Sequence, residues 1–482
     1  MKQPRSAFPS PFPRRRFLGS LLALAGGGAA PFALNLAAMG TAAAAGATDY
    51  KALVCLFMNG GNDAFNTVLA TDAGSWSEYL RIRTTLEAGS IALPGPGAGG
   101  GVLPIAPNRN GGRSFALHPE LGPLRDLFAA GRAAVVANVG TLVEPTTLVQ
   151  YKSGAVALPA HLFSHNDQQS MWQSNRPEGA NVGWGGRLGD MLAAGNGNAS
   201  FTCVSAAGNA VFLSGREIRQ YQVDAAGAVP IRNLNGALFG APASANPLQA
   251  IIAGERGETF EKDHAAVLSR AIGSQTLLGA AMAPSGAGGV PAPQPYINPN
   301  TRRQARNTLA VQLQTVARVI AGRASLGMAR QVFYVNIGGF DTHDDQKTGH
   351  ADLMARVAHA IAYFDAALAD LGGADLRSKV TLFTASDFGR TFTSNGDGTD
   401  HGWGAHHFVV GGAVRGRDIY GAFPVSGLGH ALDVGSGALL PTSSVDQYGA
   451  TLASWFGLSA GQIADVFPNI GNFSERNLGF MG

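Results

Sequence analysis

The 482-residue chain contains few cysteines and few charged residues. Cys55 and Cys203 are the only cysteines, so no disulfide framework can hold the fold and a hydrophobic core must do so. Charged residues make up 14% and hydrophobic residues 45%, a composition that excludes wholesale disorder. Each cysteine lies in an apolar, strand-like run. We therefore expect two buried thiols, although an oxidising compartment would allow them to pair.

Most of the chain carries no net basic charge. The formal net charge is +3, but residues 1–45 contribute +5 and no acid, which leaves −2 for the remainder. No block of like charges follows. Because nucleic-acid binders normally carry a basic stripe, this distribution argues against that class, and we expect no nucleic-acid partner.

Long apolar runs are confined to the N-terminus. Arg14-Arg15-Arg16 precede an apolar stretch over about 17–39, and Thr41-Ala42-Ala43-Ala44-Ala45 follow it. This order predicts a twin-arginine signal peptide over residues 1–45, with the twin-arginine translocase as export partner and a periplasmic or secreted mature protein. An N-terminal membrane anchor is the alternative. No later run reaches the ~18 apolar residues of a membrane span, so none should remain after cleavage.

The mature part, residues 46–482, is expected to form a single large α/β domain. Continuous apolar runs predict buried strands, typical of a parallel sheet covered on both faces, at 51–58, 133–139, 331–337 and 379–385. Apolar spacings of three and four predict helices at about 258–282, 302–323 and 349–371. The last helix should connect strands 331–337 and 379–385 as a parallel pair. The segments 90–114 and 284–300 are rich in Pro and Gly and are expected to form loops, and residues around 195–250 are expected to form a small cap.

Acidic and histidine residues follow two of these strands. Asp341 and His343 come after strand 331–337, and Asp387 and Arg390 after strand 379–385. Ligands of α/β sheets gather at the carboxyl ends of strands. We therefore expect Asp341, His343 and Asp387 to bind a metal, and Arg390 to clamp an anion. A solvated acidic turn and an Asp–Arg pair that only fixes a turn are the alternatives.

Three further segments carry candidate residues. His401, His406 and His407 lie within seven residues among glycines, and imidazole suits Zn, Mn or Fe. Asp63, after the first strand, is a further candidate ligand or else a helix cap. Ser164 and His165 are candidates for nucleophile, base or ligand, with a plain helix start as the alternative.

Together these residues resemble a known family. The twin-arginine start, Asn59-Gly60-Gly61-Asn62-Asp63, Ser164-His165, the segments 338–343 and 386–390 and the downstream histidines resemble the exported bacterial family called domain of unknown function 1501. That family is similar in fold to the alkaline phosphatase and sulfatase superfamily. The resemblance implies metals at the carboxyl ends of a mostly parallel sheet, and hydrolysis of phosphate or sulfate esters through a Ser, Thr or formylglycine nucleophile.

The resemblance assigns metal ligands residue by residue. It implies Asp63, or else Asn59, as the acidic ligand after the first strand, and Asp341 with His343 as an Asp-and-His pair. Asp387 matches the Asp of a second such pair, in which Phe388 stands at the position of the His. The last His ligand matches His401 or His406.

The nucleophile is less clearly matched. Ser164 and Thr67 are the candidates, with His165 to relay protons and Arg390 to bind the anionic oxygens. The bound group would be a divalent metal such as Zn, Mn or Ca.

Three functions follow from the sequence. The first is an exported metal-dependent hydrolase acting on a small-molecule or envelope-polymer ester of phosphate or sulfate. The second is a non-catalytic binding or assembly protein that keeps the superfamily fold. The third is a metal-free acid–base hydrolase centred on Ser164, His165 and Asp167.

Overall fold

The computed structural model describes residues 49–482, except 85–89 and parts of 230–256. The predicted signal peptide lies outside the described residues. Within the described part of the chain, no helix has the length and hydrophobicity needed to cross a membrane.

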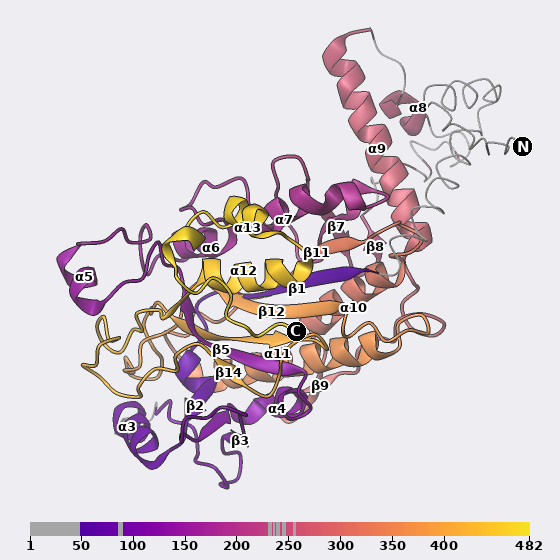
Figure 1. The fold of residues 1–482 in the computed structure, drawn as a ribbon. Coiled ribbons are helices and arrows are strands. Elements are labelled where there is room, and N and C mark those ends of the chain that lie inside the picture. Colours follow the sequence, from indigo (N-terminus) through magenta and orange to yellow (C-terminus); the bar gives the residue numbers. More distant parts are fainter. Residues whose placement is uncertain are drawn as a thin grey trace, which may run out of the picture.

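A ten-stranded, mostly parallel sheet forms the centre of the molecule (Figure 1). Its middle strand, β1 (Lys51–Met58), is parallel to β11 (Arg330–Ile337) on one side and to β12 (Val380–Ser386) on the other. All three strands are almost entirely buried, as continuous apolar runs require. Strands 331–337 and 379–385 were expected to pair with each other. They do not, because β1 lies between them and hydrogen-bonds to both.

The sheet continues on both sides of these three strands. On one side, β13 (Ala405–Val410) is antiparallel to β12 and to β5 (Ala133–Gly140), and the short strands β14 (Ile419–Tyr420) and β15 (Ser443–Ser444) pair with β5. On the other side follow β6 (Cys203–Ser205), β7 (Tyr221–Asp224) and β8 (Gly227–Ala228). The described residues of the expected cap at 195–250 thus include three strands of the central sheet.

Helices cover both faces of the sheet, and strand alternation sends side chains to each face in turn. One face packs on α4 (Gly122–Ala129), α10 (Thr308–Ala321) and α11 (Gln346–Ala369). The other packs on α7 (Trp184–Leu192), α12 (Val445–Phe456) and α13 (Ala460–Val466). Cys55 and Cys203 are free and buried in this second core, so the expectation of buried thiols is confirmed. The predicted α/β class is confirmed as well.

The remaining elements lie around this three-layer body. The three predicted helices form. Of these, α10 begins later than expected, at Thr308, and α11 begins earlier, at Gln346. Asn307 caps α10 by accepting from the backbone of Leu309 and Ala310. The other predicted helix, α9 (Thr259–Ala281), projects from the body next to α8 (Leu248–Ala253) (Figure 1). The predicted loops hold only short strands. The smaller elements are β2 (Val68–Ala70), α3 (Ala73–Arg83), β3 (Leu103–Ile105), β4 (Phe115–Leu117), α5 (Leu148–Ser153), α6 (His165–Ser174), β9 (Tyr296–Ile297) and β10 (Gln304–Ala305).

Because β1, β11 and β12 are parallel, the segments that follow them meet at one edge of the sheet. Gly60 makes the closest approach possible: its φ is +117°, and a Cβ there would lie 2.3 Å from the backbone nitrogen of Asp341. The start of α6 reaches the same edge, since His165 contacts Asp387. Residues from four distant parts of the chain are thereby brought together.

Candidate metal centre

Asp341 lies at the centre of a group of titratable side chains at this edge. Its Oδ1 accepts a hydrogen bond from Nη1 of Arg390 at 2.8 Å and lies 3.1 Å from Nε2 of His343 and 3.3 Å from Nε2 of His401. Its Oδ2 lies 3.3 Å from Nε2 of His165. Burial acts to raise the pKa of Asp341, but Arg390, His165 and His343 hold that pKa below its ordinary value. We call His165, Asp341, His343 and His401 the Asp341 cluster.

His165 is the first residue of α6 and is held from behind by Asp387. Its Nδ1 lies 2.7 Å from Oδ2 of Asp387, and this hydrogen bond raises the pKa of His165. Since an ionised carboxylate only accepts, the proton of a neutral imidazole lies on Nδ1. Nε2 then carries a lone pair directed at Asp341, and this buried atom makes no hydrogen bond to any described residue.

His401 and His343 repeat this arrangement. Nδ1 of His401 lies 2.7 Å from the backbone oxygen of Phe163, which can only accept, so Nδ1 carries the proton of the neutral ring. Nδ1 of His343 faces Oδ1 of Asp400 at 3.3 Å. The two Nε2 atoms lie 2.9 Å apart. Burial lowers the pKa of His401, which favours its neutral form.

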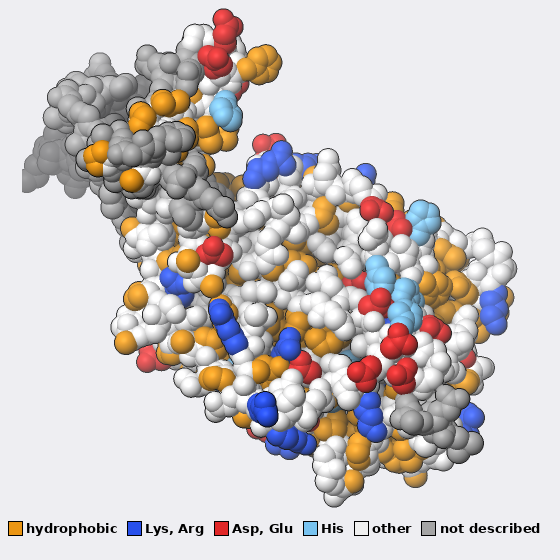
Figure 2. Space-filling model, turned by 180° about the vertical axis from the view of Figure 1, so that it is seen from behind, with side chains coloured by type: hydrophobic (Ala, Val, Ile, Leu, Met, Phe, Trp, Pro, Cys, Tyr) orange, Lys and Arg blue, Asp and Glu red, His pale blue; other side chains and the backbone are white. Residues whose placement is uncertain are grey.

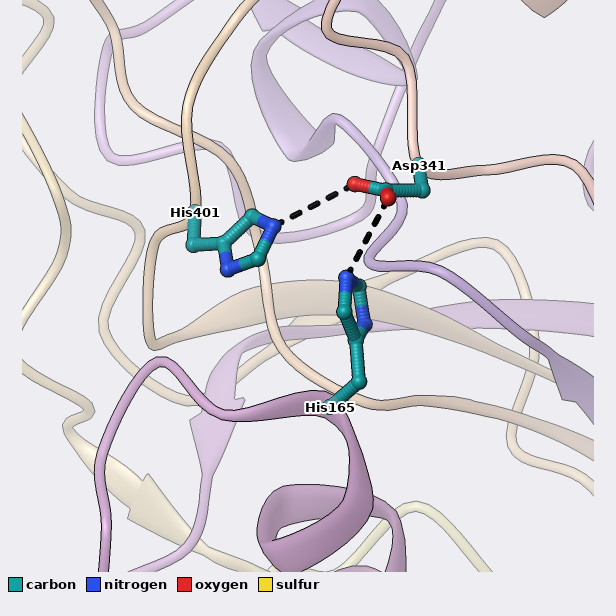
Figure 3. Close-up of side chains that lie close together, drawn as sticks. All are labelled: His165, Asp341 and His401. Atoms are coloured by element: carbon teal, nitrogen blue, oxygen red, sulfur yellow. Dashed lines mark hydrogen bonds and ion pairs between the residues drawn. The ribbon is translucent and has the colours of Figure 1, made fainter.

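The arrangement suits a divalent cation. Three imidazoles present Nε2 to one carboxylate, and each Nδ1 faces an oxygen, which is how metal-binding histidines are usually held. Ligand atoms of His165, Asp341 and His401 lie within 4.8 Å of one another, and Figure 3 shows the three side chains turned toward each other. Protonation of all three rings would instead place three positive charges beside one carboxylate. The four side chains of the cluster are 24–45% exposed, so a cation has access; Figure 2 shows histidine and acidic side chains together on the surface.

Asp387 and Arg390 lie behind the cluster. Asp387 directly follows β12; its Oδ1 accepts from the backbone of Gly60, and its Oδ2 accepts from Gln169 as well as His165. Arg390 has a side chain that is 0% exposed. Its guanidinium donates to Asp341, to the backbone of Gly60 and twice to Thr399. Asp387 is therefore placed to orient His165, and Arg390 to hold Asp341 in position; the expected anion clamp would need an exposed guanidinium.

Asp63 and His406, the other predicted ligands, lie apart from the Asp341 cluster. Asp63 is 0% exposed and pairs with Arg83. His406 is 1% exposed on β13; its Nδ1 accepts from the backbone of Asn138, and its ring stacks on Phe423. Burial lowers the pKa of His406 to about 3. His406 and His407, expected as metal ligands or partners of ligands, instead lie on a strand and fill opposite faces of the core.

Ser164 lies beside the cluster but is directed elsewhere. Its hydroxyl donates to Oδ2 of Asp167 at 3.0 Å, while both nitrogens of His165 face Asp341 and Asp387. Ser164, His165 and Asp167 therefore do not form a proton relay in this structure. Thr67, the other candidate hydroxyl, is buried and donates to the backbone of Asp63.

Sequence reasoning missed several groups that support the site. Arg83 ends α3, and Gln169 lies one turn after His165 on α6; only the helical spacing of Gln169 could have pointed to its position. The backbone oxygen of Phe163 carries no sequence signal. It is presented from a residue with φ of +71°, an uncommon conformation for a side chain of this size.

A known protein family matches most of this chain. The family described as "Protein of unknown function (DUF1501)" matches residues 50–436, so the chain belongs to that family. No curated protein matches it.

Two solved structures are similar over most of their length. One, described as concerning the metabolism of multiple glycosaminoglycans by Bacteroides thetaiotaomicron, is 12% identical; the match covers 87% of this chain and 74% of that one, with a TM-score of 0.34. The other, a crystal structure of Ps i-CgsB in complex with k-i-k-neocarrahexaose, is 10% identical, with 88% and 77% covered and a TM-score of 0.34.

Proposed function

We propose that the chain is an exported, metal-dependent hydrolase of phosphate or sulfate esters in the bacterial cell envelope. The observation that carries the proposal is the convergence of three imidazole Nε2 atoms on Asp341, with Nδ1 of each ring facing an oxygen. Of these, His165, Asp341 and His401 lie close enough to share one ion, and nitrogen ligands beside a carboxylate favour Zn, Mn or Fe over Ca. When bound, such an ion would polarise the ester and activate a nucleophile.

The residues of the chain would hold and orient this centre. Asp387 fixes the ring of His165, and Arg390 fixes the carboxylate of Asp341, so that both ligands are positioned before the ion arrives. The substrate would be a small-molecule ester or an ester on an envelope polymer. Export follows from the predicted signal peptide and the twin-arginine route.

A non-catalytic binding or assembly protein is the second candidate. Its support is Phe388, which stands where the family resemblance expects a histidine; its ring centroid lies 4.9 Å from that of His165 and 4.7 Å from that of His401. A further support is that the hydroxyl of Ser164 is directed at Asp167. Such a protein would bind a cation or a ligand without turnover.

The test compares Asp341→Asn with Asp375→Asn. The two aspartates are 45% and 50% exposed and each pairs with an arginine, but Asp375 pairs with Arg377 before β12 and outside the cluster. Metal content of the purified mature protein would be measured by elemental analysis. Wild type and both variants would then be assayed on aryl phosphate, aryl phosphodiester and aryl sulfate substrates.

We expect wild type and Asp375→Asn to hold metal and hydrolyse at least one ester, and Asp341→Asn to lose both. A folded wild-type protein that binds no added Zn, Mn or Fe would contradict the proposal. Metal binding without hydrolysis of any ester would favour the binding protein instead.

A further inference from the structure

Asp63 has no free position for a metal ion. An ionised carboxylate offers about four lone-pair sites. Oδ1 of Asp63 accepts from the backbone of Phe65 at 3.0 Å and from Nη2 of Arg83 at 3.0 Å. Oδ2 accepts from Nη1 of Arg83 at 2.5 Å and from Nε2 of Gln346 at 2.6 Å. All four sites are used by protein donors.

Arg83 is equally committed to this position. Its side chain is 0% exposed. Besides Asp63, it donates to Oδ1 of Asn66 and to the backbone oxygens of Thr391 and Phe392. These contacts use all five N–H groups of a guanidinium. The charge of Asp63 is therefore balanced by a fixed protein cation.

A chain of hydrogen bonds links this pair to the Asp341 cluster. Gln346 donates to Asp63 and accepts from the hydroxyl of Thr399 at 2.6 Å. Thr399 in turn accepts from Nε of Arg390 at 3.2 Å, and Arg390 donates to Asp341 at 2.8 Å. Arginine only donates and a carboxylate only accepts, so the direction of each bond is set from both ends.

We propose that Arg83 takes the place of a second metal ion beside Asp63, so that the chain binds one divalent cation, held by the Asp341 cluster. This inference rests on the proposed metal-dependent function and deepens it. The first-strand carboxylate, which the family resemblance implies as a ligand, supports the centre only through Gln346, Thr399 and Arg390.

The test is the stoichiometry of metal binding by the full mature chain. Metal-stripped wild type would be titrated with Zn²⁺ and, separately, Mn²⁺, and bound ions counted by native mass spectrometry. The same titration would be made with Asp341→Ala and with the double variant Asp63→Asn/Arg83→Gln, which removes both buried charges together. Circular dichroism would show whether each variant folds, and wild type alone still tests the stoichiometry if the double variant does not.

We expect one bound ion in wild type and none in Asp341→Ala. The double variant should still bind one ion at saturation, with a Kd weakened by no more than about tenfold, the lower end of the effect of an outer-shell change. Two tightly bound ions in wild type, or no ion in a folded double variant, would overturn the inference while leaving the metal-dependent function intact. No ion in wild type would overturn the proposed function itself, and the inference with it.

Discussion

Two groups of histidines in this molecule have different surroundings. In the Asp341 cluster, the side chains of His165, His343 and His401 are 24–39% exposed, and their Nε2 atoms share one carboxylate. A second group, which we call the core histidines, is at most 2% exposed: His118, His350, His406 and His407. Number and spacing in the sequence do not distinguish the two groups; what distinguishes them is whether a ring nitrogen faces an accessible anion.

Burial lowers the pKa of all four core histidines and so favours their neutral form. Nδ1 of His406 accepts from the backbone of Asn138, and Nε2 of His350 faces the side-chain oxygen of Asn62. Burial lowers the pKa of His350 to about 4 and that of His406 and His407 to about 3. Such residues fill the core with a polar, uncharged ring.

The largest difference between the two groups should appear on replacing one member of each. His401→Gln removes a nitrogen from the Asp341 cluster, and we expect the affinity for Zn²⁺ to fall by at least about 100-fold, beyond the usual effect of an outer-shell change. His406→Gln should leave the affinity unchanged but cost about 1–3 kcal/mol of unfolding free energy, because a buried hydrogen bond is disturbed. Competition with a chelator and urea unfolding measure the two quantities.

The opposite result would contradict the assignment of metal binding to the Asp341 cluster. If His406→Gln lost metal while His401→Gln kept it, the site would lie on β13 and not at the edge of the sheet. Equal loss of metal in both variants, with intact folding, would mean that the two regions are coupled.

A second, smaller difference should appear on acidification of the metal-free protein. In the unfolded chain a histidine gains its proton near pH 6.5, whereas folded His406 stays neutral down to about pH 3. The unfolded state then binds more protons, so this stabilising contribution is complete above pH 6.5 and is lost as the pH falls toward 3. For each such histidine, the free energy of unfolding should therefore fall by about 2 kcal/mol between pH 7.5 and pH 5.0.

Urea unfolding at these two pH values measures this loss. His406→Gln has no imidazole to protonate at this position, so its unfolding free energy should fall by about 2 kcal/mol less than that of wild type over the same interval. An identical fall in both proteins would show that His406 is not held neutral by the core.

Parts of this arrangement could be predicted from the sequence. Continuous apolar runs indicated the central strands, and the position of Asp341, His343 and Asp387 directly after them indicated one shared edge. The strand β13 could not be distinguished from a loop, because glycines surround its histidines. Strand alternation places His406 and His407 on opposite faces. This separation cannot be predicted from the sequence unless the strand itself is recognised.

The partners of the site were harder to predict. Arg83 lies 20 residues from Asp63 in the sequence, and His401 bonds to a backbone oxygen 238 residues away. Such contacts depend on the packing of separate loops rather than on residue type. The sequence therefore indicated several groups at the edge, but not which of them face the cluster and which lie behind it.

The smallest expected effect separates two neighbours at the start of α6. Ser164→Ala removes the hydroxyl that donates to Asp167, and we expect a loss of unfolding free energy of about 0.5–1.5 kcal/mol, the usual contribution of one hydrogen bond. Metal affinity should not change, since His165 keeps its contacts with Asp341 and Asp387. On any ester that wild type hydrolyses, the rate should stay within about threefold, because a hydroxyl held by Asp167 is not an activated nucleophile. A fall in kcat of more than about 100-fold with metal still bound would instead identify Ser164 as the nucleophile, turned away in this structure and released when substrate binds.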